Sequence, residues 1–498
     1  MMAHRPVVPL SELVGHLSGT PPSPAAPLVR GVAYDSRTVR PGDLFVCLRG
    51  AREDGHRHAA EAVRRGAVAL VVERPVEGLD GLPRIAVPDT RRELPRLAAR
   101  FYGEPSARLH LTGVTGTEGK TTTVYLLDAI LRRAGVRSGM FGTIVNRVGP
   151  RTEPALLTTA ESVDLQRMLW ECVQAGVTHV VMEVTSHALA QGRVARCEFD
   201  VAVFTNLHVD HLDFHGSVER YRIAKAALFG ELGRGPAKAG RGVGVVNMDD
   251  AHAWYMRLVC PRPVVGFGMA RPAPVKGRLL IADLDRTVFK AETPNGTVTV
   301  SLPLAGPFNA ANALAAIAAA GTMRIDLPTT KQALEGVAGV PGRLERVPNA
   351  RGLLIVIDFA HTQAAFEEIL PFLRRFTAGR LITVFGCAGD RDRTKRPVIG
   401  RLVTKLSDFA LVTTDNPASE DPADIAQEVA HGAREVDSKG ERHLVILDRR
   451  QAVRHALALA RSGDVVLVAG KGHEDFQLIA GARIPYSDRE TLTEILRG

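Results

Sequence analysis

Residues 109–123 read Leu-His-Leu-Thr-Gly-Val-Thr-Gly-Thr-Glu-Gly-Lys-Thr-Thr-Thr, and this stretch decides the fold. A short apolar run comes before the three glycines, and a helical pattern of apolar residues follows from Val124 to Leu131. Glycines let the backbone approach a phosphate closely, and the N–H groups at a helix N-terminus point toward that anion. The stretch therefore predicts a phosphate-binding loop between a strand and a helix.

The residues that follow the glycines fit a nucleoside triphosphate. Lys120 would reach the outer phosphates, and the Thr121 hydroxyl would hold a magnesium ion. Five residues, not four, separate Gly113 from Gly119, so the spacing departs from the strict pattern. A glycine turn that only caps a helix is the alternative, and the lysine and three threonines that follow argue against it.

Size and composition limit the possible classes of protein. A chain of 498 residues corresponds to about three domains at roughly 150 residues each. The net charge of +9 suits anionic ligands, but the basic residues are scattered, so we expect no nucleic-acid partner. Five widely spaced cysteines indicate a reducing compartment. No run approaches the roughly 18 apolar residues of a membrane span, so we expect a soluble, cytoplasmic protein.

Strand-like and helical runs alternate along most of the chain. We expect an α/β fold with domains at residues 1–107, 108–340 and 341–498. Alternation in the last two predicts mostly parallel sheets covered on both faces, and ligands of such sheets bind at the carboxyl ends of the strands. The expected strands of the central domain include 179–184, 201–204 and 244–247, followed by a β-rich insertion at 277–304. Those of the last domain are expected near 353–358, 381–385, 409–413, 444–447 and 465–469.

Two neighbouring strand ends bring metal-binding side chains toward the loop. Glu183 ends one strand, and Asp210, His211 and His215 follow the next. Carboxylates and phosphate oxygens suit magnesium, which predicts such a site here. Histidine is less usual on magnesium, so Asp210, His211 or His215 could instead cap a helix or form a salt bridge.

Lys225 lies on a predicted helix among apolar and small residues. Either it is a partly buried amine with a lowered pKa, or its stem lies along the surface with the ammonium in water. Composition alone favours the surface position.

Ten motifs in one order make nearly the whole chain similar to the Mur ligase family, and most of all to its UDP-N-acetylmuramoyl-tripeptide synthetases. They are GVTGTEGKTTT from Gly113, LTTAESVDLQ from Leu157, MEVTSHALAQGRV from Met182, TNLHVDHLDFHG from Thr205, YRIAKAALF from Tyr221, GPFNAANALAAIAA from Gly306, GRLERV from Gly342, FGCAGDRDRTKRP from Phe385, DNPASEDP from Asp415 and GKGHEDFQ from Gly470.

The resemblance implies a uridine-nucleotide domain, a central P-loop ATPase domain and a C-terminal Rossmann-like domain that brings the incoming amino acid. It implies a ligase of peptidoglycan synthesis that uses ATP and Mg²⁺ to phosphorylate the D-glutamyl γ-carboxylate of UDP-N-acetylmuramoyl-L-alanyl-D-glutamate. The amine of a diamino acid then attacks the acyl phosphate to form an amide. We expect the enzyme to be a monomer.

The resemblance also implies roles for individual residues. The catalytic residues would be Lys120, Glu183, His211 and Lys225, and the metal ligands Thr121, Glu183, His211 and Lys225 as a carbamate. This reverses the surface interpretation of Lys225. ATP would contact Gly116, Thr117, Glu118, Gly119, Lys120, Thr121, Thr122, Asn309, Arg343 and Asp358. The UDP substrate would contact Tyr34, Ser36, Ala51, Arg52, Glu53, Leu157, Thr158, Thr159, Ser186, Gln191 and Arg193. The amino acid would contact Arg391, Asp415, Asn416, Pro417, Ala418, Gly470 and Glu474.

Ala418 bears on which amino acid is added. Family members that add meso-diaminopimelate carry arginine there, and its guanidinium pairs with the second carboxylate. Losing that charged hydrogen bond would cost roughly 1.5–3 kcal/mol, so we expect L-lysine or L-ornithine, with meso-diaminopimelate as the alternative. Arg391 would bind the α-carboxylate, and Asp415 and Glu474 would receive the side-chain ammonium.

Three departures from the family pattern involve four residues. Glu118 replaces asparagine, Phe359 replaces tyrosine, and Gln363-Ala364 replace Pro-Asp. Other classes also stay open: a folylpolyglutamate synthetase, which would not need residues 31–56, a related ligase of specialised metabolism, and a catalytically silent nucleotide-binding regulator. The presence of Lys120, Glu183, His211 and Lys225 argues against the last.

Overall fold

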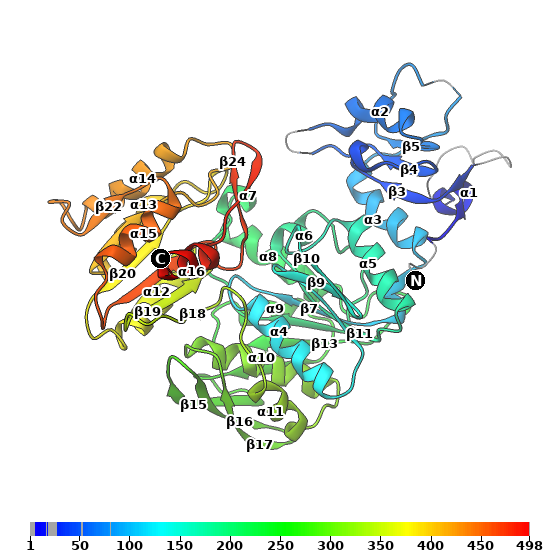
Figure 1. Ribbon diagram of the computed structural model, residues 1–498. Coiled ribbons are helices and arrows are strands. Elements are labelled where there is room, and N and C mark those ends of the chain that lie inside the picture. Colours follow the sequence, from blue (N-terminus) through cyan, green and yellow to red (C-terminus); the bar gives the residue numbers. More distant parts are fainter. Residues whose placement is uncertain (1–4, 16, 18–26, 51–52, 80, 498) are drawn as a thin grey trace.

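The computed structural model describes residues 5–15, 17, 27–50, 53–79 and 81–497. Three sheets organise these residues into an N-terminal, a central and a C-terminal unit. The N-terminal and C-terminal units lie on opposite sides of the central one, at the upper right and at the left of Figure 1. No helix in the described ranges has both the length and the apolar character that crossing a bilayer requires.

The N-terminal unit is a small parallel sheet in the order β3-β4-β5-β6. Every residue of its two middle strands is buried, because one apolar cluster packs on each face of the sheet. Its elements are β1 (Val8–Pro9), α1 (Leu10–Val14), β2 (Leu28–Val29), β3 (Gly31–Ala33), β4 (Asp43–Val46), α2 (Ala59–Arg64), β5 (Ala69–Val72), β6 (Arg84–Ala86) and α3 (Thr90–Phe101).

The central unit contains an eleven-stranded sheet in the order β10-β9-β8-β11-β7-β12-β13-β14-β15-β16-β17. The seven neighbouring strands β8-β11-β7-β12-β13-β14-β15 pair in parallel, whereas β9 and β10 at one end of the sheet and β16 and β17 at the other pair antiparallel. Its strands are β7 (His110–Thr115), β8 (Ser138–Phe141), β9 (Val145–Val148), β10 (Arg151–Pro154), β11 (His179–Glu183), β12 (Val201–Phe204), β13 (Val243–Asn247), β14 (Val264–Gly268), β15 (Val275–Ala282), β16 (Thr287–Thr293) and β17 (Gly296–Leu302). The mostly parallel sheet predicted from the sequence is confirmed.

Helices cover both faces of this sheet, as the alternating pattern predicts. Apolar residues of α4, α10 and α11 form the core on one face, and those of α5, α8 and α9 form the core on the other. The helices are α4 (Lys120–Arg133), α5 (Ser162–Gln174), α6 (Ser186–Ala190), α7 (Leu212–His215), α8 (Val218–Gly230), α9 (Ala253–Val259), α10 (Phe308–Thr322) and α11 (Leu327–Glu335). Strands β8, β11, β7 and β12 are therefore buried on both faces, and their carboxyl ends share one edge.

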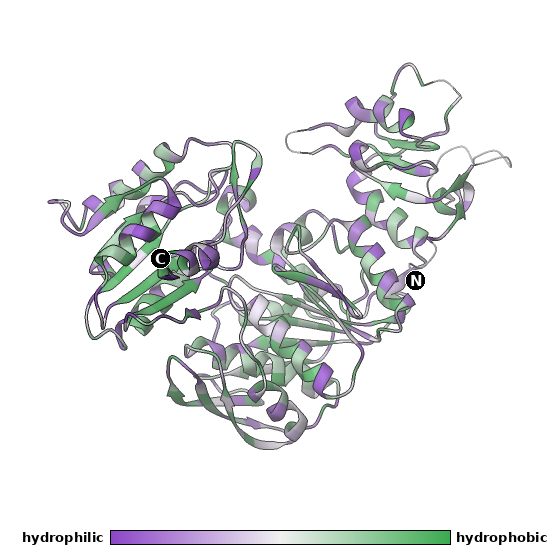
Figure 2. Ribbon diagram, viewed as in Figure 1, coloured by the Kyte–Doolittle hydropathy of each residue, from purple (hydrophilic) through white to green (hydrophobic). Residues whose placement is uncertain are grey.

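The C-terminal unit is a second sheet with buried clusters on both faces, in the order β18-β19-β23-β20-β21-β22. In Figure 2 its strands are largely green, and the surrounding helices alternate green and purple. Its elements are β18 (Glu345–Val347), β19 (Leu354–Asp358), α12 (Gln363–Arg374), β20 (Leu381–Phe385), α13 (Lys395–Leu406), β21 (Phe409–Val412), α14 (Pro422–Arg434), β22 (His443–Val445), α15 (Arg449–Leu459), β23 (Val465–Ala469), β24 (Phe476–Ile479), β25 (Ala482–Pro485) and α16 (Asp488–Arg497).

Candidate active site

The predicted phosphate loop connects β7 to α4. Gly119 precedes α4 with φ of +81°, and a Cβ there would lie 2.2 Å from the Asn312 amide oxygen, so this position needs glycine. The residues after β12 hold the loop in place. Glu118 N–H donates to the Asn206 side chain at 2.8 Å, and the Thr205 hydroxyl donates to the Glu118 carbonyl at 2.6 Å.

Lys120 turns back over this loop. Its Nζ donates to the carbonyl oxygens of Gly116 at 3.0 Å and Thr117 at 2.7 Å. Burial lowers its pKa, and the Glu183 and Glu118 carboxylates oppose that effect. The amine therefore lies at the glycine turn, where the outer phosphates of a nucleotide would lie.

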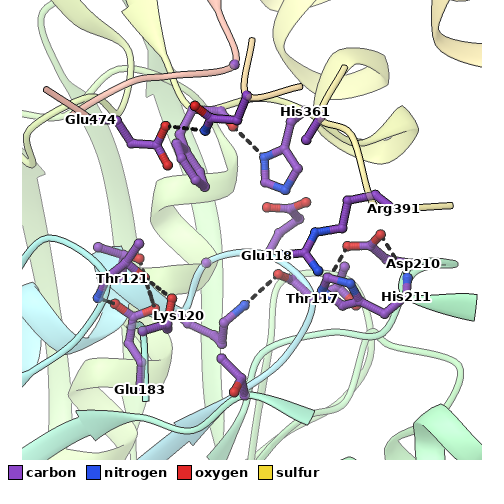
Figure 3. Close-up of a pocket in the computed structure, with 18 of the residues that line it drawn as sticks. Thr117, Glu118, Lys120, Thr121, Glu183, Asp210, His211, His361, Arg391 and Glu474 are labelled. Atoms are coloured by element: carbon purple, nitrogen blue, oxygen red, sulfur yellow. Dashed lines mark hydrogen bonds and ion pairs between the residues drawn. The ribbon is translucent and has the colours of Figure 1, made fainter. Parts of the chain in front are cut away.

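The loop opens into a cavity of about 270 Å³ between the central and C-terminal units. Figure 3 shows the loop residues, Glu183, Asp210 and His211 facing His361, Arg391 and Glu474. The lining residues are Thr117, Glu118, Gly119, Lys120, Thr121, Thr143, Thr158, Glu183, Thr185, Asp210, His211, Arg343, Phe359, His361, Ala388, Arg391, Lys395, Asp415, Asn416, Gly470 and Glu474. The structure thus brings together side chains far apart in the sequence.

Three of the expected metal ligands, Thr121, Glu183 and His211, line this cavity. The Glu183 carboxylate is 1% exposed and accepts hydrogen bonds from the Thr121 hydroxyl and from the N–H and hydroxyl of Thr143. Burial lowers the pKa of His211, which leaves its ring neutral and able to bind a cation, while Asp210 lies 3.3 Å from its Nε2.

The oxygen ligands here fit magnesium, but the protein alone does not complete a metal site. Across the described ranges, no three His, Cys, Asp or Glu side chains are grouped so as to hold a metal. The Thr121 hydroxyl and the Glu183 carboxylate are the kind of oxygen ligands that Mg²⁺ prefers. Substrate phosphates, which Mg²⁺ usually also contacts, would supply further oxygens.

Lys225 is fully buried on α8, so the surface position favoured by composition is wrong. Its Nζ donates to the Gly116 carbonyl at 2.7 Å and lies 4.4 Å from the centre of the Tyr221 ring. Burial, with Lys120 nearby, lowers its pKa far below the usual value. The amine thus lies beneath the loop, where burial disfavours its charged form, although it is not among the residues that line the cavity.

A second cavity adjoins the loop on the other side. Thr122 and the predicted nucleotide residues Asn309, Arg343 and Asp358 line it together, alongside Phe308 and Asn312. Arg343 spans the two units, because its guanidinium donates to the Thr121 hydroxyl at 3.2 Å and stacks over the Phe359 ring.

The three departures from the family pattern lie near the boundary between the units. The Glu118 carboxylate accepts a hydrogen bond from the Thr362 hydroxyl at 2.7 Å and so turns toward the C-terminal unit. Phe359 packs against Arg343 and the His473 ring. The Gln363 side-chain amide donates a hydrogen bond to the Glu367 carboxylate at 2.7 Å, on the exposed side of α12.

The residues expected to hold the acyl substrate lie around the end of β11. Thr159 donates to the Glu183 carbonyl, and the Arg193 guanidinium donates to the Thr159 carbonyl at 3.0 Å and to the Gln191 side chain at 2.6 Å. Thr158 lines the main cavity, Ser186 is buried at the start of α6, and Leu157 is exposed.

The expected uridine-nucleotide residues lie in the N-terminal unit. The Tyr34 hydroxyl donates to Asp164 of the central unit at 2.7 Å, and the Ser36 hydroxyl donates to Glu61 at 2.8 Å. Glu53 lies 3.4 Å from the His58 ring. Ala51 and Arg52 lie outside the described residues.

Three of the expected amino-acid residues, Asp415, Asn416 and Glu474, lie around a buried lysine that the sequence interpretation missed. Lys471 donates to the Asn416 side chain at 2.9 Å and to Glu474 at 2.6 Å, and lies 3.6 Å from Asp415. Its position next to Gly470 in the GKGHEDFQ motif was the available signal. Lys471 is not among the residues that line the cavity, whereas the lining residues that the residue-by-residue assignment omitted include Thr143, Thr185, His361 and Lys395.

Pro417 and Ala418 are not among the residues that line the cavity. The Ala418 N–H donates to the Leu478 carbonyl at 2.9 Å, and its φ is +54°. Its side chain is a methyl group, so this position offers no cation to a substrate carboxylate.

Models of three protein families match the chain in succession. They are the Mur ligase family catalytic domain at residues 28–102, the Mur ligase middle domain at 114–320 and the Mur ligase glutamate ligase domain at 342–472.

Curated relatives match over almost the whole length. The UDP-N-acetylmuramoyl-L-alanyl-D-glutamate–2,6-diaminopimelate ligase of Geobacillus thermodenitrificans is 42% identical over 96% of both chains. The ligase of the same name from Bacillus cereus is 40% identical over 98% of both chains.

Solved structures of Mur ligases are also similar to this chain over almost its whole length. A structure titled as a ligase of that same name is 31% identical, covers 99% of both chains and has a TM-score of 0.65. The fold is also similar to that of a MurF ligase from Thermotoga maritima in complex with ADP, with 22% identity, a TM-score of 0.63, and coverage of 94% of this chain and 96% of that one.

Proposed function

Because this chain belongs to the Mur ligase family, we propose that its main cavity joins the D-glutamyl γ-carboxylate of UDP-N-acetylmuramoyl-L-alanyl-D-glutamate to the amine of a diamino acid. The protein is an ATP-dependent amide ligase of peptidoglycan synthesis that uses Mg²⁺. The observation that carries the proposal is one cavity in which the phosphate loop faces Arg391, Asp415 and Glu474.

Each group of residues has a proposed task. Lys120 stabilises the negative charge that develops as the γ-phosphoryl group moves to the D-glutamyl carboxylate. Mg²⁺, when bound by Thr121, Glu183, His211 and carbamylated Lys225, neutralises phosphate charge. Asn309, Arg343 and Asp358 hold the nucleotide beside Gly116 to Thr122. The acyl phosphate then meets the incoming amine, which Arg391, Asp415 and Glu474 orient.

Meso-diaminopimelate is the first candidate for the incoming amino acid. The relatives at 40–42% identity are named as ligases of 2,6-diaminopimelate, which favours the alternative over the expected L-lysine or L-ornithine. Arg391 and Lys395 line the cavity and are the cations proposed to meet its two carboxylates.

L-Lysine or L-ornithine is the second candidate, and one observation favours it. Ala418 replaces the arginine by which family members bind the second carboxylate of diaminopimelate. A monocarboxylic amino acid needs no such partner. Its side-chain ammonium would lie between the Asp415 and Glu474 carboxylates.

Phosphate release and product mass distinguish these candidates. The purified protein would receive ATP, Mg²⁺ and UDP-N-acetylmuramoyl-L-alanyl-D-glutamate, with each of the three amino acids in a separate reaction. The amino acid with the highest kcat/KM identifies the substrate. Failure to form an amide with any of them would contradict the proposal and favour a ligase of specialised metabolism. A rate of ATP hydrolysis that does not change when the acyl substrate is added would favour the nucleotide-binding regulator.

The remaining proposals concern the whole chain. We propose domain boundaries after residue 107, within the short 3₁₀ helix Pro105–Arg108, and after residue 340, in the loop between α11 and β18. All five cysteines lie in the described ranges as free thiols, which supports a reducing cytoplasmic location. Sedimentation velocity would test the expected monomer.

A further inference from the structure

Arg193 is held by three partners before any substrate arrives. Its two terminal nitrogens donate to the Thr159 carbonyl at 3.0 Å and the Gln191 side chain at 2.6 Å. Its Nε lies 3.0 Å from one carboxylate oxygen of Glu161, in an ion pair whose side chains are only 15% and 12% exposed. A guanidinium has five N–H donors, so each terminal nitrogen keeps one N–H beyond the bond that it donates. The contact between Nε and Glu161 is an ion pair without the alignment of a hydrogen bond, because the buried Nε N–H has no hydrogen-bond acceptor within the described part of the chain.

The other oxygen of Glu161 binds a second arginine. It accepts a hydrogen bond from Arg91 at 3.0 Å. Arg91 lies on α3 in the N-terminal unit, whereas Glu161 immediately precedes α5 in the central unit. One carboxylate therefore links the expected acyl-substrate arginine to the unit expected to bind the uridine nucleotide.

The arrangement fits an anionic ligand. Two guanidinium groups and one carboxylate leave a net charge of +1 in a mostly buried cluster. A mobile arginine side chain loses conformational entropy when it binds a ligand. A carboxylate that already holds the arginine in one rotamer reduces the entropy lost at the binding step. The Glu161 carboxylate thus orients Arg193 without cancelling the charge available to a substrate carboxylate.

We propose that Glu161 is a positioning residue that orients Arg193 toward the D-glutamyl part of the substrate, and that Arg91 holds Glu161 in place. The proposal rests on the proposed function, because it takes Arg193 as a contact of the acyl substrate. Glu161 itself touches no substrate in this assignment.

The central test compares Glu161→Gln with a matched control, Glu171→Gln. Glu171 is also an acid associated with α5 that pairs with two arginines, Arg167 and Arg151, but on the exposed side. We expect Glu161→Gln to raise the KM for UDP-N-acetylmuramoyl-L-alanyl-D-glutamate by about tenfold, the scale of one weakened charged contact. The kcat, the KM for ATP and the melting temperature should match those of Glu171→Gln.

A binding measurement without ATP separates positioning from general damage. Calorimetry would compare the dipeptide substrate with UDP-N-acetylmuramoyl-L-alanine, which lacks the D-glutamyl group. Glu161→Gln should weaken the first and leave the second unchanged. Glu161→Asp, which keeps the charge, should recover part of the affinity, and Arg91→Ala should cause a smaller loss than Glu161→Gln.

The outcomes distinguish this inference from the proposed function. If the wild-type protein neither binds the dipeptide substrate nor forms an amide, the proposed function fails. If the wild-type protein is active but Glu161→Gln behaves like Glu171→Gln, the positioning role is overturned. Equal weakening of both ligands by Glu161→Gln would also overturn it, because Arg193 would then not be oriented toward the D-glutamyl group.

Discussion

At the scale of single residues, Lys225 is the clearest case, because it is buried beneath the phosphate loop, where burial disfavours the charged form of its amine. Carbamylation by carbon dioxide would turn it into an anion. We predict that Lys225→Ala and Lys225→Arg both lower kcat about 100-fold or more, on the scale of losing one electrostatic stabiliser. Depleting carbon dioxide should lower the wild-type rate, and bicarbonate should restore it.

Spectroscopy of the same protein gives an independent check on Lys225. Isotope-labelled bicarbonate should produce a carbamate signal in the wild type and none in Lys225→Arg. A fully active Lys225→Arg enzyme would contradict the carbamate.

Ala418 is the second residue with a measurable consequence. We predict that Ala418→Arg raises the ratio of kcat/KM for meso-diaminopimelate to that for L-lysine by about tenfold or more, because it adds a charged partner for the second carboxylate. Ala418→Ser is the control, since it experiences the same left-handed backbone and adds no charge. An unchanged ratio in Ala418→Arg would mean that this position does not select the amino acid.

At the scale of elements, the start of α12 connects two units through one side chain. The Thr362 hydroxyl accepts from the Ala365 N–H as a helix cap and donates to the Glu118 carboxylate. We predict that Thr362→Ala lowers the free energy of unfolding of the C-terminal unit by about 1 kcal/mol, the usual worth of a cap. Chemical denaturation would measure the change.

Two companion variants separate the two contacts of Thr362. Thr362→Ser keeps both and should match the wild type, whereas Glu118→Ala removes only the contact between units. A loss in Glu118→Ala as large as that in Thr362→Ala would mean that the cap contributes nothing.

At the scale of the whole molecule, buried histidines make the free energy of unfolding depend on pH in the acidic range. Burial lowers the pKa of His179, His187 and His473 to about 4. In the unfolded chain these rings take up protons near pH 6.5, so between pH 6.5 and 4 the unfolded state binds more protons. We therefore predict that the contribution of these histidines to the free energy of unfolding is level above about pH 7 and falls as the pH drops through this range.

Denaturant titrations at several pH values would measure this dependence. His179 lies at the amino end of β11, away from the cavity, so His179→Gln provides the variant that leaves the active site intact. The free energy of unfolding of this variant should fall less between pH 6.5 and 4 than that of the wild type. An equal fall would place the titrating groups elsewhere.

Elements with continuous apolar runs were predictable to within a residue or two. The strands at 201–204, 381–385 and 465–469 have the predicted bounds, because each is buried on both faces and its apolar run ends where burial ends. The strand expected at 444–447 instead spans His443–Val445, at the sheet edge, where exposure makes the apolar pattern a weaker guide.

Contacts between polar side chains were not predictable. Lys471 and Asn416 are 55 positions apart, and Arg193 and Glu161 are 32 apart, so no local spacing relates them. Lys225 looked like a surface residue because its neighbours along the helix do not reveal what packs on them. Its buried amine donates to the Gly116 carbonyl, which lies 109 positions away in the sequence.

The sequence by itself determined the alternating α/β units, the strand–loop–helix that builds the phosphate loop, and the family, because backbone preferences and apolar periodicity act over a few residues. Only the tertiary structure decided that this loop faces Arg391 and Glu474 across one cavity, that Lys225 is buried, and that Glu161 joins Arg91 to Arg193. Those outcomes depend on how sheets and helices pack, since the partners of a buried charge come from whichever elements the packed cores bring beside it.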